Sequence, residues 1–337
     1  MGLNITQIIP KKDISLDDLR NKKLAVDASQ MLYQFLSSIR QPDGTHLMDS
    51  NDRITSHLMG ISTRIPNLIE RGLKLAFVFD GKPPSLKIHE KEQREHRKRL
   101  AESRLEKAKE EGDEELMLKY SKQTVRLSFE MSDEAKELIQ AFGLPVIQAP
   151  SEAEAQCSFM AEKEDVYAVA SSDYDSLLYS APRIVRNLTL SNKRKIRNTY
   201  VNVNPELIEL KQVLKELDIK QDQLIVLAIL IGTDYNVGGI KGIGPKSALK
   251  LVKENRNFDR LFDELKPDFD WKKIYATFKS MPIMKNYQLR WSNIDEEKIR
   301  KILVDRHDFS EERVNKMLEK LTKKEKSQKG LSSFFKP

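Results

Sequence analysis

Residues 75–80 read LAFVFD, a short apolar run that ends in a carboxylate, and this pattern decides the fold. Residues 24–27 (LAVD) repeat the design, and residues 166–170 (VYAVA) form a third apolar run that leads into the acidic segment 171–175 (SSDYD). Helical patterns separate these runs, and short buried strands that alternate with helices are typical of an α/β fold. We therefore predict a mostly parallel, twisted central sheet with helices on both faces.

Acidic residues follow these strands, and the ligand sites of parallel sheets form beyond the carboxyl ends of the strands. Other acids begin a helix after residues 145–147 (PVI) or follow the apolar segment 224–231. Any one of them could instead cap a helix or face a helix dipole. Buried together, they would repel one another and require cations, and carboxylate oxygens suit Mg²⁺. The candidate metal ligands are Asp27, Asp80, Glu152, Glu154, Asp173, Asp175 and Asp234.

The composition narrows the class of protein. A chain of 337 residues is long enough for two or three domains, or for one large core with insertions. The formal net charge of +7 fits a polyanionic partner without requiring one. Cys157 is the only cysteine, which excludes an intrachain disulfide and a thiolate metal site and suits a reducing compartment. The five histidines lack zinc-like spacing, and no apolar run is long enough to span a bilayer, so we expect no membrane association.

Residues 87–115 differ from the rest of the chain because charged residues crowd this segment and apolar residues are sparse. A helix that is polar all round is either a solvated span or an unstable helix. We predict an exposed helical insertion between the second and third strands, interrupted at Gly112. Lys87 and Arg94 are seven residues apart, so they can project from one face of such a helix. A solvated surface is the alternative interpretation for the basic residues of this segment.

Residues 237–246 (VGGIKGIGPK) lie between two helix-like runs. Their glycines let backbone N–H groups approach a phosphate closely, and Pro245 suits the first turn of a helix. We predict a helix-hairpin-helix that binds duplex DNA without sequence specificity. A plain structural turn is the alternative interpretation.

Six segments, in order and over nearly the whole chain, resemble the flap endonucleases of archaea and eukaryotes, the archaeal members above all. They are residues 25–29 (AVDAS), 55–60 (TSHLMG), 78–84 (VFDGKPP), 149–155 (APSEAEA), 232–235 (GTDY) and 242–246 (GIGPK). The resemblance implies a PIN-like 5′ nuclease fold with a helical arch and a helix-hairpin-helix. It also implies a structure-specific, Mg²⁺-dependent phosphodiesterase of DNA replication and repair. Such an enzyme cuts near the base of a 5′ single-stranded flap by two-metal-ion catalysis and also acts as a 5′–3′ exonuclease.

The same resemblance assigns roles to individual residues. Asp27, Asp80, Glu152 and Glu154 would gather around one Mg²⁺, and Asp173, Asp175 and Asp234 would serve the other, with Mn²⁺ as a substitute. Lys87 and Arg94, on the arch, would act as catalytic residues that contact the scissile phosphate. Tyr33 would stack on a base near the cut, and a K⁺ ion would bind at the hairpin. The implied DNA contacts are Gly2, Tyr33, Arg40, Arg64, Gly232, Gly242, Gly244 and Lys246.

Residues 328–335 (QKGLSSFF) follow a lysine-rich stretch and match the spacing Q-x-x-h-x-x-F-F of sliding-clamp ligands. One helical turn would group the apolar side chains, and such a tail can be disordered when free and ordered on its partner. The predicted partners are thus branched DNA with a 5′ flap and a sliding clamp, bound by a monomer that is cytoplasmic in an archaeon or nuclear in a eukaryote. The candidate clamp-binding residues are Gln328, Leu331, Phe334 and Phe335.

These expectations give a map of the chain. Residues 1–100 form an N-terminal nuclease region, 87–130 the helical arch, and 126–258 an internal nuclease region that includes the helix-hairpin-helix at 225–253. Residues 259–322 form a C-terminal helical region, and 323–337 a flexible linker with the clamp-binding tail.

Other functions compete with flap cleavage. A repair-junction endonuclease or a 5′ exonuclease would share the acidic site, although the first carries a longer insertion and the second a longer carboxyl end. A clamp-bound DNA adaptor without activity would lack the acids. A PIN-type RNA nuclease would be far shorter and would lack the hairpin and the tail.

Overall fold

The structure is a computed structural model that describes residues 3, 5–41, 43–188, 193–196 and 199–333. For residues 89, 193–196, 199–202 and 323–333 only the backbone is described. Gly2, Phe334 and Phe335 therefore lie outside the described residues, as do the side chains of Gln328 and Leu331.

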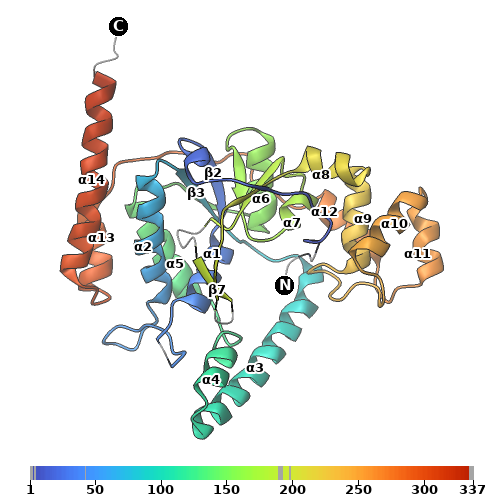
Figure 1. Ribbon diagram of the computed structural model, residues 1–337, viewed down its shortest axis with the longest axis horizontal. Coiled ribbons are helices and arrows are strands. Elements are labelled where there is room, and N and C mark those ends of the chain that lie inside the picture. The colour runs from blue at the N-terminus through green and yellow to red at the C-terminus, as the bar shows by residue number, and fades with distance from the viewer. Residues whose placement is uncertain (1–2, 4, 42, 189–192, 197–198, 334–337) are drawn as a thin grey trace.

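A seven-stranded sheet with the strand order β1-β9-β6-β5-β2-β3-β4 forms the middle of the molecule (Figure 1). Neighbours from β4 to β6 run parallel, which confirms the predicted mostly parallel sheet. These strands are β2 (Lys23–Asp27), β3 (Lys74–Phe79), β4 (Val146–Gln148), β5 (Ala168–Ala170) and β6 (Arg183–Arg186). Beyond β6, β9 (Glu206–Glu209) pairs antiparallel with β6, and the edge strand β1 (Lys12–Asp13) pairs antiparallel with β9. The sequence did not predict these two short strands.

Helices cover both faces of the sheet, as predicted, because side chains alternate along each strand. On β3, Leu75 and Phe77 pack into one apolar core, whereas Ala76 and Val78 belong to the other. The first core is completed by α1 (Ala28–Ser38), α2 (Ser56–Glu70) and α5 (Phe129–Ala141). The second is completed by α6 (Ala153–Glu162), α7 (Asp175–Leu178), α8 (Leu210–Leu217) and α9 (Gln221–Ile231).

The charged insertion is helical, as predicted, and leaves the body of the protein as two helices side by side (Figure 1). A 3₁₀ turn at Ser85–Lys87 leads into α3 (Ile88–Glu111), and α4 (Glu114–Ser121) follows. Gly112 ends α3 in the left-handed conformation at φ 68°, which glycine adopts without a steric penalty. Asp113 then begins α4 by accepting a hydrogen bond from the Leu116 N–H at 2.9 Å.

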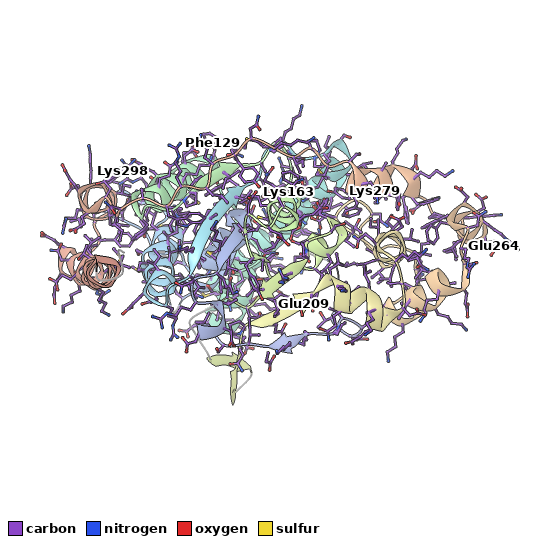
Figure 2. All side chains as sticks on the ribbon, turned by 90° about the horizontal axis from the view of Figure 1, so that it is seen from above. Phe129, Lys163, Glu209, Glu264, Lys279 and Lys298 are labelled. Carbon is purple, nitrogen blue, oxygen red and sulfur yellow. The ribbon has the colours of Figure 1, made fainter. Side chains whose placement is uncertain are left out.

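The remaining elements lie at the two ends of the molecule and on its surface. Figure 2 shows Glu264 of α11 and Lys298 of α13 at opposite ends. Helix α14 continues to Ser333, through most of the segment in which we expected a flexible linker. No helix in the described ranges is long and apolar enough to cross a membrane. The remaining helices and strands are a 3₁₀ turn (Asp17–Leu19), β7 (Lys193–Ile196), β8 (Thr199–Asn202), α10 (Pro245–Glu254), α11 (Phe258–Leu265), α12 (Trp271–Lys279), α13 (Glu296–Arg300), a π-helical turn (Lys301–Asp305) and α14 (Glu311–Ser333).

A buried charge network joins the segment before α14 to the α1–α2 loop and to α5. His307 is fully buried, and its Nδ1 lies 2.9 Å from Asp49 Oδ2 while its Nε2 lies 3.0 Å from Glu134 Oε1. Arg53 and His57 also face these carboxylates, at 2.8 Å from Asp49 and 3.6 Å from Glu134. Burial alone would lower the pKa of His307, but the hydrogen bonds to Glu134 and Asp49 outweigh burial and raise it.

Replacing His307 with glutamine should lower the free energy of unfolding by about 2–4 kcal/mol, because Asp49 would stay buried beside a weaker partner. A group whose folded pKa is raised stabilises the fold below its unfolded pKa, and this contribution is lost as pH rises through the folded pKa. The loss of stability should therefore be larger near pH 6 than near pH 9. Urea denaturation at both pH values measures it, with His96→Gln on the exposed side of α3 as the control. An equal loss at both pH values would mean that the charge on His307 does not matter.

Candidate active site at the carboxyl ends of the strands

Four of the candidate acids lie where β2 and β3 end and α6 begins. Asp27 is the last residue of β2, and its Oδ1 accepts from the Gln30 N–H at 2.9 Å, so it also caps α1. Asp80 follows β3, and its Oδ1 accepts from the Ala153 N–H at 2.7 Å. Glu152 is the N-cap residue of α6, and Glu154 lies in its first turn. The fold thus brings residues from distant parts of the sequence to one edge of the sheet.

Gly81 is needed for this arrangement. A Cβ added at residue 81 would lie 2.2 Å from the Ala149 carbonyl oxygen, so any side chain would separate the two segments. The Gly81 N–H donates to the Ser151 carbonyl at 2.7 Å, which holds the end of β3 against the start of α6. Asp80 and Glu152 are placed by this pairing of the two backbones.

The other three acids come from the segment after β5 and from the turn after α9. Asp175 is the first residue of α7, and its Oδ1 accepts from the Leu3 N–H at 3.2 Å, so Leu3 lies beside this carboxylate. Asp173 accepts from the Tyr174 N–H at 2.7 Å. Asp234 lies within a turn that is closed by a hydrogen bond from Thr233 Oγ1 to the Asn236 amide oxygen at 2.7 Å.

The shifted pKa values show that these acids interact. Burial, and then the charge of Asp80, raise the pKa of Asp27 to about 8. Burial also raises the pKa of Glu154 well above its usual value, with Asp175, Asp173 and Asp27 adding to the shift. The pKa values of Asp173 and Asp175 are raised for the same reasons, burial first and neighbouring acids among the rest. Such a cluster ionises fully only when cations compensate its charge.

Lys87 and Arg94 supply part of that compensation. The Lys87 ammonium nitrogen lies 2.6 Å from Glu152 Oε2 and 3.2 Å from Asp234 Oδ2. An Arg94 guanidinium nitrogen lies 3.0 Å from both oxygens of Asp234. Burial would raise the pKa of Asp234, but these two cations outweigh burial and lower it. The seven-residue spacing therefore does place both basic side chains on the same carboxylate.

The oxygen atoms of the seven candidate ligands are the kind that a hard divalent cation binds. All seven candidate ligands are carboxylates, and Mg²⁺ binds through a few such oxygens together with several waters. Within the described part of the chain, no three acidic, histidine or cysteine side chains converge tightly enough to hold a metal ion by themselves. What suits Mg²⁺ here is thus the chemistry of the ligands, which are all carboxylate oxygens.

The candidate DNA contacts differ in what the structure shows of them. Tyr33 is 41% exposed on α1, with the Lys98 ammonium 6.0 Å from its ring centre. Arg40 donates to the Gly44 carbonyl at 2.6 Å, and the Arg64 guanidinium lies 5.4 Å from the Phe35 ring centre, so both are held by their own surroundings. These two arginines therefore also have a structural interpretation.

The glycines of the predicted hairpin fall into two kinds. A Cβ at Gly232 would lie 2.6 Å from the Gly239 N, so this glycine serves the close approach of α9 to the turn. A Cβ at Gly242 or Gly244 would meet nothing within 4 Å, which leaves their backbone open to a ligand. Gly244 is the N-cap residue of α10, and Lys246 is exposed in its first turn. The predicted order of helix, hairpin and helix is confirmed.

The sequence did not single out two neutral residues that contact the acids. Ser171 Oγ lies 3.1 Å from Glu154 Oε1 and 3.1 Å from Gln30 Oε1. The only available signal was the position of Ser171 at the start of the acidic segment 171–175. Nothing in the spacing of Gln30 connects it to residues 141 positions away.

Comparisons with known proteins show what the chain is similar to. A model of the XPG N-terminal domain matches residues 3–101, and a model of the XPG I-region matches residues 143–234. Flap endonuclease 1 of Pyrococcus furiosus is 50% identical over 340 residues, and the match covers 100% of both chains. The solved structure of flap endonuclease-1 from Methanococcus jannaschii is 42% identical, with a TM-score of 0.76 over 95% of this chain and 98% of that one.

A more distant solved structure shares only the fold. The Holliday junction-resolving enzyme GEN1, in complex with product DNA and a Mg²⁺ ion, is 19% identical, with a TM-score of 0.50 over 94% of this chain and 67% of that one. The full-length relatives are much closer. On their evidence the chain belongs to the flap endonuclease 1 family, structure-specific nucleases that act on DNA in replication and repair.

Proposed function

We propose that this flap endonuclease hydrolyses a phosphodiester near the base of a 5′ flap with two Mg²⁺ ions, and Mn²⁺ as a substitute. Asp27, Asp80, Glu152 and Glu154 would hold one ion, and Asp173, Asp175 and Asp234 would serve the other. When bound, the ions supply an activated water and stabilise the leaving oxygen of an in-line displacement. The observation that carries the proposal is the gathering of seven acids, with raised pKa values on most, at one edge of the sheet.

Lys87 and Arg94 would act on the scissile phosphate. Both come from the base of the arch, and both already lie against Asp234. A phosphodiester that enters this edge of the sheet brings negative charge that competes for the same ammonium and guanidinium groups. In the transition state, where charge on the phosphoryl oxygens develops, the two cations would stabilise it.

The DNA duplex would be bound by residues 237–246, the hairpin between α9 and α10. The open backbone at Gly242 and Gly244 and the exposed Lys246 support this role, with a K⁺ ion bound at the turn. Tyr33 would stack on a base near the cut, and Gly2, Arg40, Arg64 and Gly232 are the further candidate contacts. Replacing K⁺ with Na⁺ should weaken binding to duplex DNA, and equal affinities would argue against the ion.

The carboxyl end would recruit a sliding clamp through Gln328, Leu331, Phe334 and Phe335. Support for this comes from the sequence, since the motif lies beyond the described side chains. A chain truncated after residue 327 should cleave at an unchanged rate when the clamp is absent. Adding the clamp should no longer stimulate it. Stimulation of the truncated chain would contradict the assignment. The flap endonucleases compared above come from archaea, which supports a cytoplasmic enzyme, and we propose that it acts as a monomer.

Cleavage of end-labelled DNA tests the function. A substrate with a 5′ flap should be cut near its junction with Mg²⁺ and left intact with EDTA, and a matched 3′ flap should stay intact throughout. Binding without cleavage would favour an adaptor, and equal cutting of both flaps would contradict the proposed polarity. A blunt duplex in the same gel measures the 5′–3′ exonuclease activity that the family resemblance also implies.

A further inference from the structure

A neutral polar pair, Gln30 and Ser171, lies between the two groups of acids. Ser171 follows β5 directly and is 5% exposed. Its hydroxyl lies 3.1 Å from the carboxylate oxygen of Glu154, an acid of the first group, and it accepts a hydrogen bond at 3.1 Å from the backbone N–H of Asp173, an acid of the second. A single side chain therefore contacts both groups.

The hydroxyl proton of Ser171 can go to only one acceptor. Glu154 Oε1 and Gln30 Oε1 both lie 3.1 Å away, but an ionised carboxylate is a much stronger acceptor than an amide oxygen. When Glu154 is ionised, Ser171 thus donates to it and, through its lone pair, holds the backbone of Asp173. This fixes the orientation of the Glu154 carboxylate relative to the start of the acidic segment.

Gln30 completes the connection from α1. Its backbone N–H donates to Asp27 Oδ1 at 2.9 Å, and its side-chain oxygen accepts a hydrogen bond from the Ser172 N–H. The acid at the end of β2 and the loop after β5 are thereby tied to the same residue. The loop joins β5 to α7, and these side-chain hydrogen bonds connect it to α6 through Glu154 and to α1 through Gln30.

We propose that the side chains of Ser171 and Gln30 are positioning groups, which hold Glu154 and Asp173 in the orientation that binds Mg²⁺ together with Asp27. The inference rests on the proposed metal assignment. Partners that orient metal ligands typically change metal affinity about 10- to 100-fold when they are removed. The pair does not touch the reacting atoms, and its role is exerted through the carboxylates that it holds.

Ser171→Ala should raise the Mg²⁺ concentration for half-maximal cleavage about tenfold, with a smaller change at saturating Mg²⁺. Ser171→Thr keeps the hydroxyl, so its Mg²⁺ concentration for half-maximal cleavage should stay within about threefold of that of the unchanged protein. Gln30→Ala should shift the midpoint in the same direction, and the double variant should not exceed the product of the single effects, because both act on one loop. A second readout, without DNA, is the Mg²⁺ concentration that produces half of the metal-dependent rise in melting temperature.

Ser158→Ala is the matched control. Its hydroxyl is also fully buried and lies on α6 with Glu154, but it donates to the backbone carbonyl of Glu154 at 2.6 Å and leaves the carboxylate alone. It should lower the melting temperature without moving the Mg²⁺ midpoint. Unchanged midpoints in Ser171→Ala and Gln30→Ala, or an equal shift in Ser158→Ala, would overturn the inference. If the unchanged protein neither cleaves nor gains stability with Mg²⁺, the metal assignment itself has failed.

Discussion

Replacing Asp175 with alanine will abolish cleavage of a 5′ flap at saturating Mg²⁺, with a loss of at least about 10³-fold, while the flap DNA still binds. Asp175 is buried, and burial together with Asp173 and Asp234 raises its pKa well above the usual value. Its charge therefore has to be compensated by a cation, and the proposed mechanism uses that cation in the reaction. Single-turnover cleavage and a binding titration with Ca²⁺ in place of Mg²⁺ separate the two effects.

A second variant separates the charge of Asp175 from its structural contact. The carboxylate also accepts from the Leu3 N–H, and Asp175→Asn keeps an oxygen that can do the same. We expect the asparagine variant to fold as well as the unchanged protein and to be as inactive as the alanine variant. Substantial cleavage by either variant would remove Asp175 from the proposed metal site.

Replacing Lys87 with alanine will slow the chemical step about 10²- to 10³-fold without a comparable loss of DNA affinity. The Lys87 ammonium contacts Glu152 and Asp234, where the scissile phosphate would have to lie for metal-assisted hydrolysis. Arg94→Ala should act in the same direction, because Arg94 shares Asp234 with Lys87. Lys91→Ala is the matched control, an exposed lysine on α3 between the two.

A different outcome would assign Lys87 another role. If its ammonium only competes with Mg²⁺ for Glu152, the alanine variant will need less Mg²⁺ and will reach the rate of the unchanged protein. A reduced rate at every Mg²⁺ concentration indicates stabilisation of the transition state instead. Lys87→Arg keeps the charge and tests whether the geometry of the ammonium group matters.

The sequence predicted those parts of the fold that depend on the local order of apolar and charged residues. The apolar runs at 24–27 and 75–80 each predict a buried strand with a carboxylate at its carboxyl end. The structure places Asp27 and Asp80 at the carboxyl ends of β2 and β3. The charged helical insertion was predictable because sparse apolar residues cannot build a core. The antiparallel strands β1 and β9 could not be predicted. β1 consists of two exposed residues, and the sequence of β9, ELIE, does not alternate between apolar and polar residues.

Contacts between distant residues could not be predicted from spacing. Ser171 and Gln30 meet across 141 positions, and His307 meets Asp49 across 258. In both cases the partners are ordinary polar residues whose significance depends on burial. The carboxylates could be singled out as candidate ligands because there are many of them and they share one chemistry. A single serine or histidine in the sequence gives no comparable signal.

The hydrogen bond from the Leu3 N–H to Asp175 has a practical consequence for fluorescence experiments. A fusion or dye attached at the amino end would lie beside the proposed metal site, and one at the carboxyl end would lie on the proposed clamp motif. An internal dye avoids both ends, and the chain allows it, because Cys157 is the only cysteine and is fully buried. A cysteine at the exposed position of Glu264, at the far end of the molecule (Figure 2), would be the one thiol that a maleimide reaches readily. Donor and acceptor dyes on the protein and the flap could then follow the approach of the flap to an enzyme whose two termini are unaltered.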